Sequence, residues 1–313
     1  MRKLLLLVLA LLLPGEVSAA DRFWVGGTGS WSDDDNHWAT TTGGVPANGN
    51  LPTAADNAIF DALSNTTAYT VTVDVAAVCL DLNFSAPPAV SGTITWAGSS
   101  TLAISGGMTL LSGMTRTYTG AITFNATSGT KTITTNSVAT ASPVTFNGVG
   151  GTWQLAGAWN VGSSWTVTNG TLDTNGQTVT NLTVLSSNNS NVRTITLGAS
   201  DITITGTTSI TFTTSTNLTF TAGTSTIRCT APSTFNGGGK TFATVIFSGG
   251  GTNTIGNHSN TFGTFTDTGT VNKTGALVFN SGTTQTVTGT FTVTGDSPTN
   301  RVLVKSSTVG TAY

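Results

Sequence analysis

The sequence predicts an all-β fold, namely a right-handed parallel β-helix (β-solenoid) with an N-terminal aromatic-rich cap. Three observations support this prediction. Short alternating segments fill the chain from about Tyr69 onward, a Phe-Asn dipeptide recurs at multiples of about 22 residues, and a compact tryptophan-rich segment precedes the alternating part. Beyond Ala20, no stretch shows the sustained apolar spacing of an amphipathic helix.

The alternating segments are clearest between positions 200 and 230. Apolar pairs recur there at roughly constant short intervals: Ile202/Ile204, Ile210/Phe212, Leu218/Phe220 and Ile227/Cys229. Threonine, which is β-branched, favours extended backbone, and Gly and Asn supply turns. This local pattern alone fits a β-sandwich or barrel as well as a solenoid.

A longer repeat favours the solenoid. Phe124 and Phe146 are separated by about 22 residues, Phe235 and Phe279 by about twice that interval, and each is followed by Asn. A repeat of this size is typical of coils that must stack because one coil cannot bury its apolar face alone. Residues 65–313 are therefore predicted to form roughly eleven coils, a rod on the order of 50 Å long.

Residues 1–20 have the features of a secretory signal peptide. Two cations, Arg2 and Lys3, precede an apolar run from Leu4 to Leu13, and small residues end the segment at Ala20. The alternative is a membrane anchor, but the run is only about 10 residues long and a span needs about 20. We expect a secreted, extracellular or cell-surface protein whose mature chain does not insert into membranes.

Residues 21–64 form the predicted cap, which would cover the open first coil of the solenoid. Tryptophans recur there every seven residues, with a glycine cluster between the first two. The candidate structural residues of the cap are Trp24, Gly26, Gly27, Gly29, Trp31, Trp38 and Asp56.

The cap segment resembles the N-terminal cap of large secreted bacterial proteins with right-handed β-helices, of the adhesin and autotransporter-passenger type, and similar segments occur in phage-encoded surface proteins. The motif W-x-G-G-x-G-x-W, from Trp24 to Trp31, carries the resemblance together with Asn36-His37-Trp38 and Phe60-Asp61. The resemblance implies an extracellular scaffold or adhesin and transfers no catalytic residue.

The last alternating segment, Val302-Leu303-Val304, stands close to the final residue, Tyr313. A bare last coil would expose an unpaired edge. We therefore expect either a truncated sequence or self-association at the C-terminal end.

The two cysteines are predicted to remain unpaired. The alternation of Val78, Leu80 and Leu82 predicts that Cys79 points outward, whereas Cys229 shares an inward face with Ile227. Their separation in a coiled chain corresponds to roughly 30 Å, and a disulfide tolerates under about 7 Å between Cα atoms.

Catalysis has little support in the sequence. Glu16 is the only glutamate, and among the Asp residues after the cap segment no two are one predicted coil apart. The later pair that comes nearest, Asp173 and Asp201, is out of phase with the repeat. Glycoside hydrolysis needs two carboxylates about 5–10 Å apart. A polysaccharide-active lyase or hydrolase, which the solenoid fold commonly hosts, remains the enzyme alternative.

Metal and cofactor sites are also weakly supported, and no cofactor is expected. The only weak metal candidate is Asp33, Asp34 and Asp35, which an Asp/Asn turn explains better because the EF-hand glycine and glutamate are missing. His37 and His258 have no ligand partner at zinc spacing. The net charge of −2 and the lack of a basic stripe argue against nucleic acid as a partner.

Three further tryptophans, Trp153, Trp159 and Trp165, suggest either a sugar-stacking platform or core residues. Each has an apolar neighbour two positions later, which favours the core.

Taken together, these features predict a secreted structural or adhesive solenoid whose Thr/Ser/Asn-rich surface binds glycans or cell-surface proteins. The alternatives are the polysaccharide-active enzyme and a virion-associated host-recognition fibre.

Overall fold

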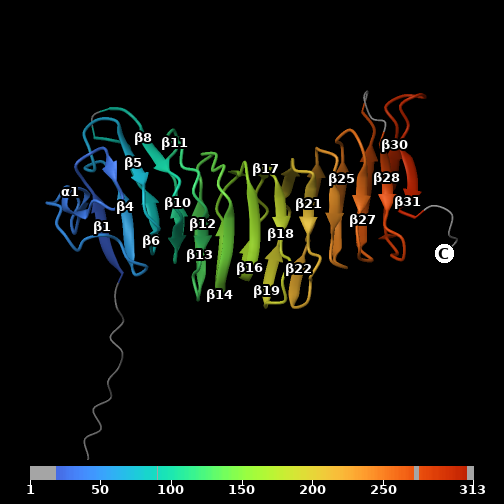
Figure 1. Cartoon of the computed structure of the whole chain (residues 1–313), viewed down its shortest axis with the longest axis horizontal. Coiled ribbons are helices and arrows are strands. Elements are labelled where there is room, and N and C mark those ends of the chain that lie inside the picture. Colours follow the sequence, from blue (N-terminus) through green and yellow to red (C-terminus); the bar gives the residue numbers. More distant parts are fainter. Residues whose placement is uncertain (1–18, 90, 271–274, 309–313) are drawn as a thin grey trace, which may run out of the picture.

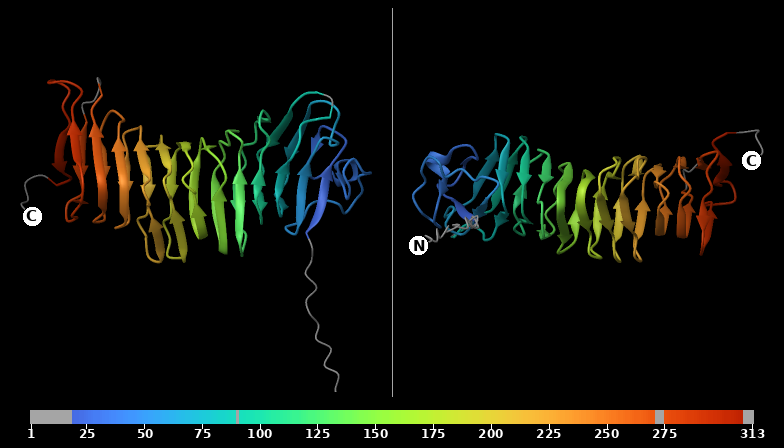
Figure 2. Two further views of the ribbon diagram at one scale, coloured as in Figure 1. Left: turned by 180° about the vertical axis from the view of Figure 1, so that it is seen from behind. Right: turned by 90° about the horizontal axis from the view of Figure 1, so that it is seen from below.

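The chain winds into an elongated β-solenoid of about 10 turns, with strands side by side along the rod from the N-terminal to the C-terminal end (Figure 1). A computed structural model describes residues 19–89, 91–270 and 275–308. The predicted signal peptide, residues 1–20, lies outside this part of the chain except for its last two positions. Two further views show the same single row of coils (Figure 2).

Within the described residues, the strands form three hydrogen-bonded sheets, and one short helix, α1 (Asp34–His37), lies near the N-terminal end. The largest sheet contains β1 (Ala20–Trp24), β3 (Trp38–Ala39), β4 (Asp56–Phe60), β6 (Ala77–Cys79), β7 (Leu82–Phe84), β9 (Leu102–Ile104), β10 (Met108–Thr109), β12 (Ile122–Phe124), β13 (Thr130–Thr134), β14 (Val144–Leu155), β16 (Ser164–Asp173), β18 (Val184–Ser186), β19 (Arg193–Thr196), β21 (Thr208–Thr211), β22 (Leu218–Thr221), β24 (Thr234–Asn236), β26 (Asn253–Ile255), β28 (Ala276–Phe279) and β31 (Leu303–Ser306). The second contains β2 (Gly29–Ser30), β5 (Tyr69–Val73), β8 (Ile94–Gly98) and β11 (Thr115–Arg116). The third contains β15 (Trp159–Asn160), β17 (Val179–Leu182), β20 (Asp201–Ile204), β23 (Thr226–Cys229), β25 (Thr241–Phe247), β27 (Thr261–Thr268), β29 (Thr286–Val287) and β30 (Phe291–Thr294).

Parallel pairing between successive coils decides against a sandwich. Among the described strands the pairing is parallel throughout except between β1 and β3, where Trp24 lies opposite Trp38. Strand partners are one coil apart: Phe124 pairs with Phe146 in the next coil, and Thr194 pairs with Thr219 across a slightly longer coil. The predicted fold class is therefore confirmed, with coils that vary in length around the expected repeat.

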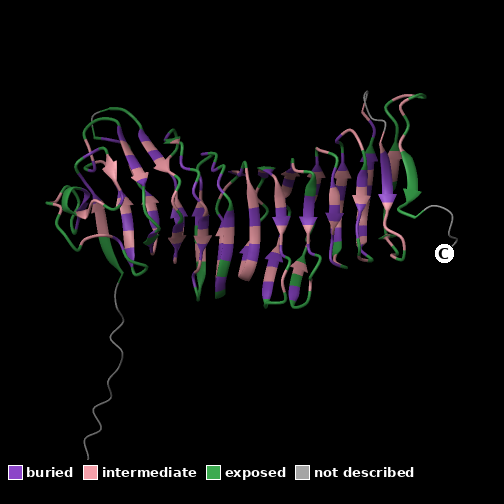
Figure 3. Ribbon diagram, viewed as in Figure 1, coloured by how far each residue is buried: buried purple, intermediate pink, exposed green. Residues whose placement is uncertain are grey.

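Inward side chains form a continuous apolar core. Phe124 and Phe146 stack directly, with ring centroids 5.5 Å apart and ring planes 10° apart. Phe235 and Phe279 occupy the same sheet, where Ile255 lies between them in register. Figure 3 shows the resulting alternation along most strands, where buried positions are followed by intermediate or exposed ones. This pattern arises because successive side chains of a strand point to opposite faces.

The three tryptophans of the 153–165 segment belong to this core. Trp153, Trp159 and Trp165 are buried, as the apolar neighbours predicted. The Trp159 indole Nε1 donates a 2.8 Å hydrogen bond to the buried hydroxyl of Thr140. A sugar-stacking platform at these residues is therefore excluded.

The N-terminal end of the core is closed by aromatic side chains. Trp24, Trp31 and Trp38 are buried, and the ring of Trp38 meets the rings of the other two tryptophans edge to face. Phe60 packs edge to face against Trp38 and stacks on Phe84 of the next coil. The segment also contributes strands, since β1 and β2 pair in parallel with β4 and β5. The cap is thus built into the first coil and continues the core column.

The prediction for the orientation of Cys79 was wrong. Cys79 is buried, whereas Val78 is exposed, because β6 ends at Cys79 and a turn at Leu80 and Asp81 separates it from β7. This break shifts the alternation by one residue, and such a shift reverses which side chains face the core. Both cysteines are nevertheless free, as expected, and they belong to different sheets.

Candidate functional site

One outward surface carries a regular array of hydroxyl groups. Five threonines occupy equivalent positions in the consecutive strands β13, β14, β16, β19 and β22, which follow one another along the lower side of the rod in Figure 1. Each is the register partner of the next. This row consists of Thr130, Thr152, Thr171, Thr194 and Thr219.

A second row lies two positions further along the same five strands. It consists of Thr132, Gln154, Asp173, Thr196 and Thr221. Between the two rows, the side chains of the last four strands point inward, and three of them are fully buried: Trp153, Leu172 and Ile195. Both rows therefore face outward, and we call their ten members the hydroxyl face.

The strand geometry sets the dimensions of the hydroxyl face. Neighbouring strands lie about 4.8 Å apart, and residues two positions apart on a strand are separated by roughly 6.6 Å. Each threonine offers a hydroxyl that can donate and accept, next to a methyl group. Within the face, Gln154 Nε2 donates to Asp173 Oδ2 at 2.9 Å, which engages the only charged side chain of the array. The face is otherwise uncharged and suits a neutral polar ligand.

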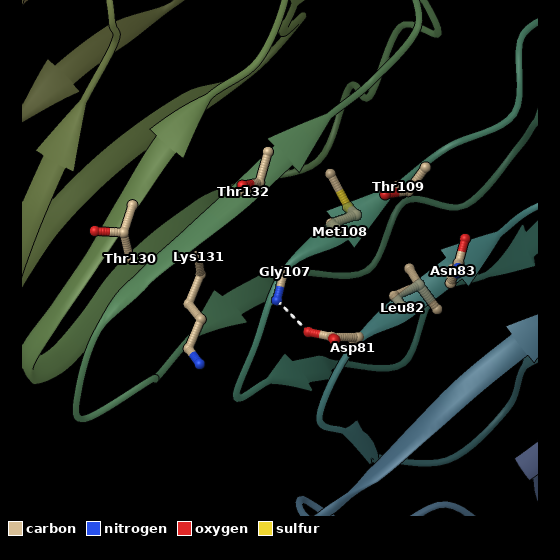
Figure 4. A pocket seen from close by; sticks show the side chains of 9 residues that line it. All are labelled: Asp81, Leu82, Asn83, Gly107, Met108, Thr109, Thr130, Lys131 and Thr132. Carbon is tan, nitrogen blue, oxygen red and sulfur yellow. Dashed lines mark hydrogen bonds between the residues drawn. The ribbon is translucent and has the colours of Figure 1, made fainter. Parts of the chain in front are cut away.

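An open groove of about 350 Å³ adjoins the N-terminal edge of the hydroxyl face. It forms where β13 extends beyond the short strand β10, because Gly107 and the two residues before it are not part of a strand. The lining residues are Asp81, Leu82, Asn83, Gly107, Met108, Thr109, Thr130, Lys131 and Thr132 (Figure 4). Thr130 and Thr132 belong to both the groove and the hydroxyl face, so the two surfaces are continuous.

The groove brings together two opposite charges. The Asp81 carboxylate accepts a 2.6 Å hydrogen bond from the Gly107 backbone N–H, and Lys131 lies on the other side of Gly107 (Figure 4). Among the described residues, the Lys131 ammonium makes neither a hydrogen bond nor an ion pair. Of the described residues that line the groove, Asp81 alone carries a carboxylate. The two-carboxylate arrangement of glycoside hydrolysis is therefore not assembled there.

The predicted cap residues serve structural roles. Gly26 has φ +76°, and a Cβ on it would lie 2.7 Å from the Asn36 carbonyl oxygen. A Cβ on Gly29 would lie 1.8 Å from His37 Nε2. Only glycine fits at these two positions, since side chains there would collide with the helix α1 and its flank.

Asp56 anchors the start of β4. Its Oδ2 accepts hydrogen bonds from the Thr53 hydroxyl at 2.5 Å and the Thr53 N–H at 3.0 Å, and its Oδ1 lies 3.5 Å from Arg22. All of these partners are local or belong to the paired strand β1. Asp56 therefore secures the first coil.

The three consecutive aspartates form the start of α1, with Asp33 at the N-cap and Asp34 and Asp35 in the first turn. Asp33 accepts both hydrogen bonds from the Asn36 amide, Asp34 accepts one from the Gly49 N–H, and Asp35 is exposed to solvent. In the described part of the chain, no group of three or more His, Cys, Asp or Glu side chains is arranged to hold a metal ion.

The two histidines lie at opposite ends of the rod. His37 is buried against Trp24 in the cap, whereas His258 lies in a bend between β26 and β27. The two imidazoles therefore cannot share a ligand.

Asp173 and Asp201 do not meet. Asp173 lies on β16 of the largest sheet, and Asp201 lies on β20 of the third sheet, where it pairs with Arg228 at 2.9 Å. Sequence reasoning placed these carboxylates correctly out of phase but missed that Lys131 and Asp81 line one groove. One coil, which contains Gly107, intervenes between these two residues, and a comparison of adjacent coils alone overlooks such a pair.

Comparisons with protein-family models, with curated proteins and with solved structures find no match for this chain. No helix in the described residues is long and apolar enough to cross a membrane. Function is therefore inferred from the hydroxyl face, the groove and the sequence features.

Proposed function

We propose that the protein is a secreted structural or adhesive β-solenoid whose hydroxyl face binds glycan chains. The observation that carries this proposal is the register of the five threonines from Thr130 to Thr219. Export is supported by the signal-peptide features of residues 1–20.

The hydroxyl face matches the chemistry of a neutral polysaccharide. The first and last threonine of the row are separated by four strand spacings, about 19 Å, which is enough for several sugar units. A single hydrogen bond contributes only about 1 kcal/mol net. Repeated contacts along an extended ligand make such weak interactions add up, and tethering of several sites raises the apparent affinity further.

A glycan array probed with the mature protein tests the proposal. The informative variant is Thr171→Val combined with Thr194→Val, because valine keeps the β-branched shape and removes two central hydroxyls. We expect binding to weaken at least tenfold. The matched control replaces Thr226 and Thr244, which are register partners on the third sheet, by Val.

The result is decisive in either direction. Loss of binding in the first double variant but not in the control supports the hydroxyl face. Unchanged binding in both, or no glycan bound by the unaltered protein, contradicts the proposal. Circular dichroism of each variant verifies that the fold is retained.

The groove favours one second candidate, polysaccharide cleavage. The Lys131 ammonium, which has no partner in the described part of the chain, lines the same groove as the Asp81 carboxylate, and a positioned base beside an acid is the minimum for proton transfer. Incubation with a polysaccharide panel, followed by chain-length analysis, tests this function. Cleavage that disappears in Lys131→Met would support an enzyme, whereas binding without shortened products supports the adhesive function.

A further inference from the structure

A second polar pocket lies where one sheet of the solenoid ends and another begins. The second sheet ends at β11 and the third begins only at β15, because the strands between them, β12, β13 and β14, all belong to the largest sheet. Next to this interruption is a pocket of about 370 Å³. It is lined by Ser112, Gly113, Met114, Arg116, Asn136, Ser137, Val138 and Ala139.

Among the described residues that line this pocket, Arg116 alone is charged. Its guanidinium carbon lies 5.5 Å from the ring centroids of both Trp96 and Tyr118, which stack on each other 4.5 Å apart. One Nη2 N–H donates to the buried Ser142 hydroxyl. The aromatic stack fixes the direction of the side chain, since an arginine held over ring faces loses few conformations on binding a ligand.

The charge of Arg116 has no counter-ion in the described structure. The salt bridges of arginine join Arg22 to Asp56 and Arg228 to Asp201, and none involves Arg116. Its Nε is buried and has no hydrogen-bond partner among the residues that the structure describes. Burial lowers the pKa of Arg116 to about 10, which reflects the cost of holding the cation away from water. An anion in the pocket would relieve this cost.

Residues 136–139, which also line the pocket, include a neutral donor. Asn136 and Ser137 both have positive φ, +47° and +66°, a conformation that is uncommon for non-glycine residues and that Asn adopts more readily than Ser. Asn136 Nδ2 donates to the Leu110 carbonyl at 2.8 Å, which fixes this loop. Within the described residues the Ser137 hydroxyl makes no hydrogen bond, so it is free to bind a ligand.

We propose that this pocket binds the carboxylate of an acidic sugar, with Arg116 as the charged partner and Ser137 as a neutral donor. The planar guanidinium matches a carboxylate, and the volume is at the lower end of small-ligand pockets, the size of one sugar unit. This inference rests on the proposed glycan binding and adds a preference for uronate-containing chains. The hydroxyl face would bind neutral units, and the pocket would select the acidic one.

Titration of the mature protein with glucuronate tests the pocket, with intrinsic fluorescence as the readout because Trp96 lies under Arg116. We expect saturable binding of glucuronate and at least tenfold weaker binding in Arg116→Met, which keeps the apolar contact with the rings. The matched control is Arg228→Met, which removes an exposed arginine on another sheet and should bind glucuronate normally. Glucose, which lacks the carboxylate, should not bind.

Three results would overturn the proposal: no glucuronate binding by the unaltered protein, equal binding by Arg116→Met, or binding of inorganic sulfate without glucuronate. Thermal unfolding of Arg116→Met establishes that the variant folds, and Arg116→Lys provides a second, charge-retaining variant that should keep part of the affinity. The Thr171→Val and Thr194→Val variant should bind glucuronate normally. Failure of the pocket and failure of the hydroxyl face are therefore distinguishable.

Discussion

The His37 imidazole lies flat against the Trp24 indole, with ring centroids 4.5 Å apart and ring planes 3° apart. His37 Nδ1 lies 2.8 Å from the Val25 carbonyl oxygen, so the imidazole is fixed from two directions. This stack closes the N-terminal end of the core column. The position of His37 also explains why Gly26 and Gly29 leave no room for side chains.

Replacement of Gly29 by Ala should disrupt this closure. The new Cβ would lie 1.8 Å from His37 Nε2, so the imidazole must leave its position on Trp24. Overpacking of this kind costs about 1–3 kcal/mol. Urea unfolding should report the lower free energy of unfolding, and near-ultraviolet circular dichroism should report the altered tryptophan environment.

The matched control for Gly29→Ala is Gly157→Ala. A Cβ on Gly157 meets no atom within 4 Å, and its φ is not in the left-handed region. The control should unfold at the same urea concentration as the unaltered protein. Equal stability of both variants would contradict the assignment of Gly29 to the closure of the cap.

Arg193 should be essential for the stability of the middle coils. The side chain is buried, and its N–H groups donate to the Ser187 hydroxyl and to the backbone carbonyls of Ser187, Asn191, Thr214 and Thr216 at 2.6–2.9 Å. Arg193→Met would leave these acceptors unpaired inside the protein. We expect a loss of about 3–5 kcal/mol in the free energy of unfolding.

Arg228→Met is the control for this prediction, since the pair with Asp201 is nearly half exposed and contributes at most about 1 kcal/mol. Chemical unfolding of both variants gives the comparison. Similar losses from the two substitutions would show that the carbonyl contacts of Arg193 are not stabilising.

The buried thiols should make the protein less stable at alkaline pH. Burial raises the pKa of Cys229 to about 12, and it raises the pKa of Cys79 as well. Above about pH 9 the unfolded chain loses thiol protons that the folded chain retains, so stability falls as pH rises toward about 12. The slope is about 1.4 kcal/mol per pH unit for each thiol.

Unfolding measured between pH 8 and pH 11 checks this dependence. The Cys79→Ala and Cys229→Ala double variant should show a shallower decline, although the buried Tyr69 and Tyr118, whose pKa values burial also raises, leave part of it in place. A thiol reagent should label neither cysteine in the folded protein. Rapid labelling at neutral pH would contradict the burial of both.

Thr140 should stabilise the start of the third sheet. Its buried hydroxyl accepts the Trp159 Nε1–H at 2.8 Å and donates to the Val161 carbonyl at 3.2 Å. Thr140→Val keeps the shape but leaves the indole N–H unpaired, at a cost of about 1–3 kcal/mol. Thr180→Val, at an outward position of β17, should cost little. Thermal unfolding distinguishes the two, and equal melting temperatures would contradict the prediction.

Amino-acid patterning alone was sufficient to predict the fold class, the burial of Trp153, Trp159 and Trp165, and the separation of the two cysteines. These features depend on alternation within a strand and on a repeat of about 22 residues, both of which are local or averaged properties. The tryptophan spacing likewise pointed to the cap, because apolar rings at the end of a solenoid must cover its core.

The inward orientation of Cys79, the register of the hydroxyl face and the meeting of Lys131 and Asp81 in one groove depend on how whole coils stack. Coils vary in length: the coil from Trp153 to its partner Leu172 is several residues shorter than the coil from Thr194 to Thr219. Turns absorb this variation, so the pattern of one coil does not specify which residue of the next lies beside it. Hydrogen bonding between coils selects the register, and a shift of one residue would exchange the inner and outer faces.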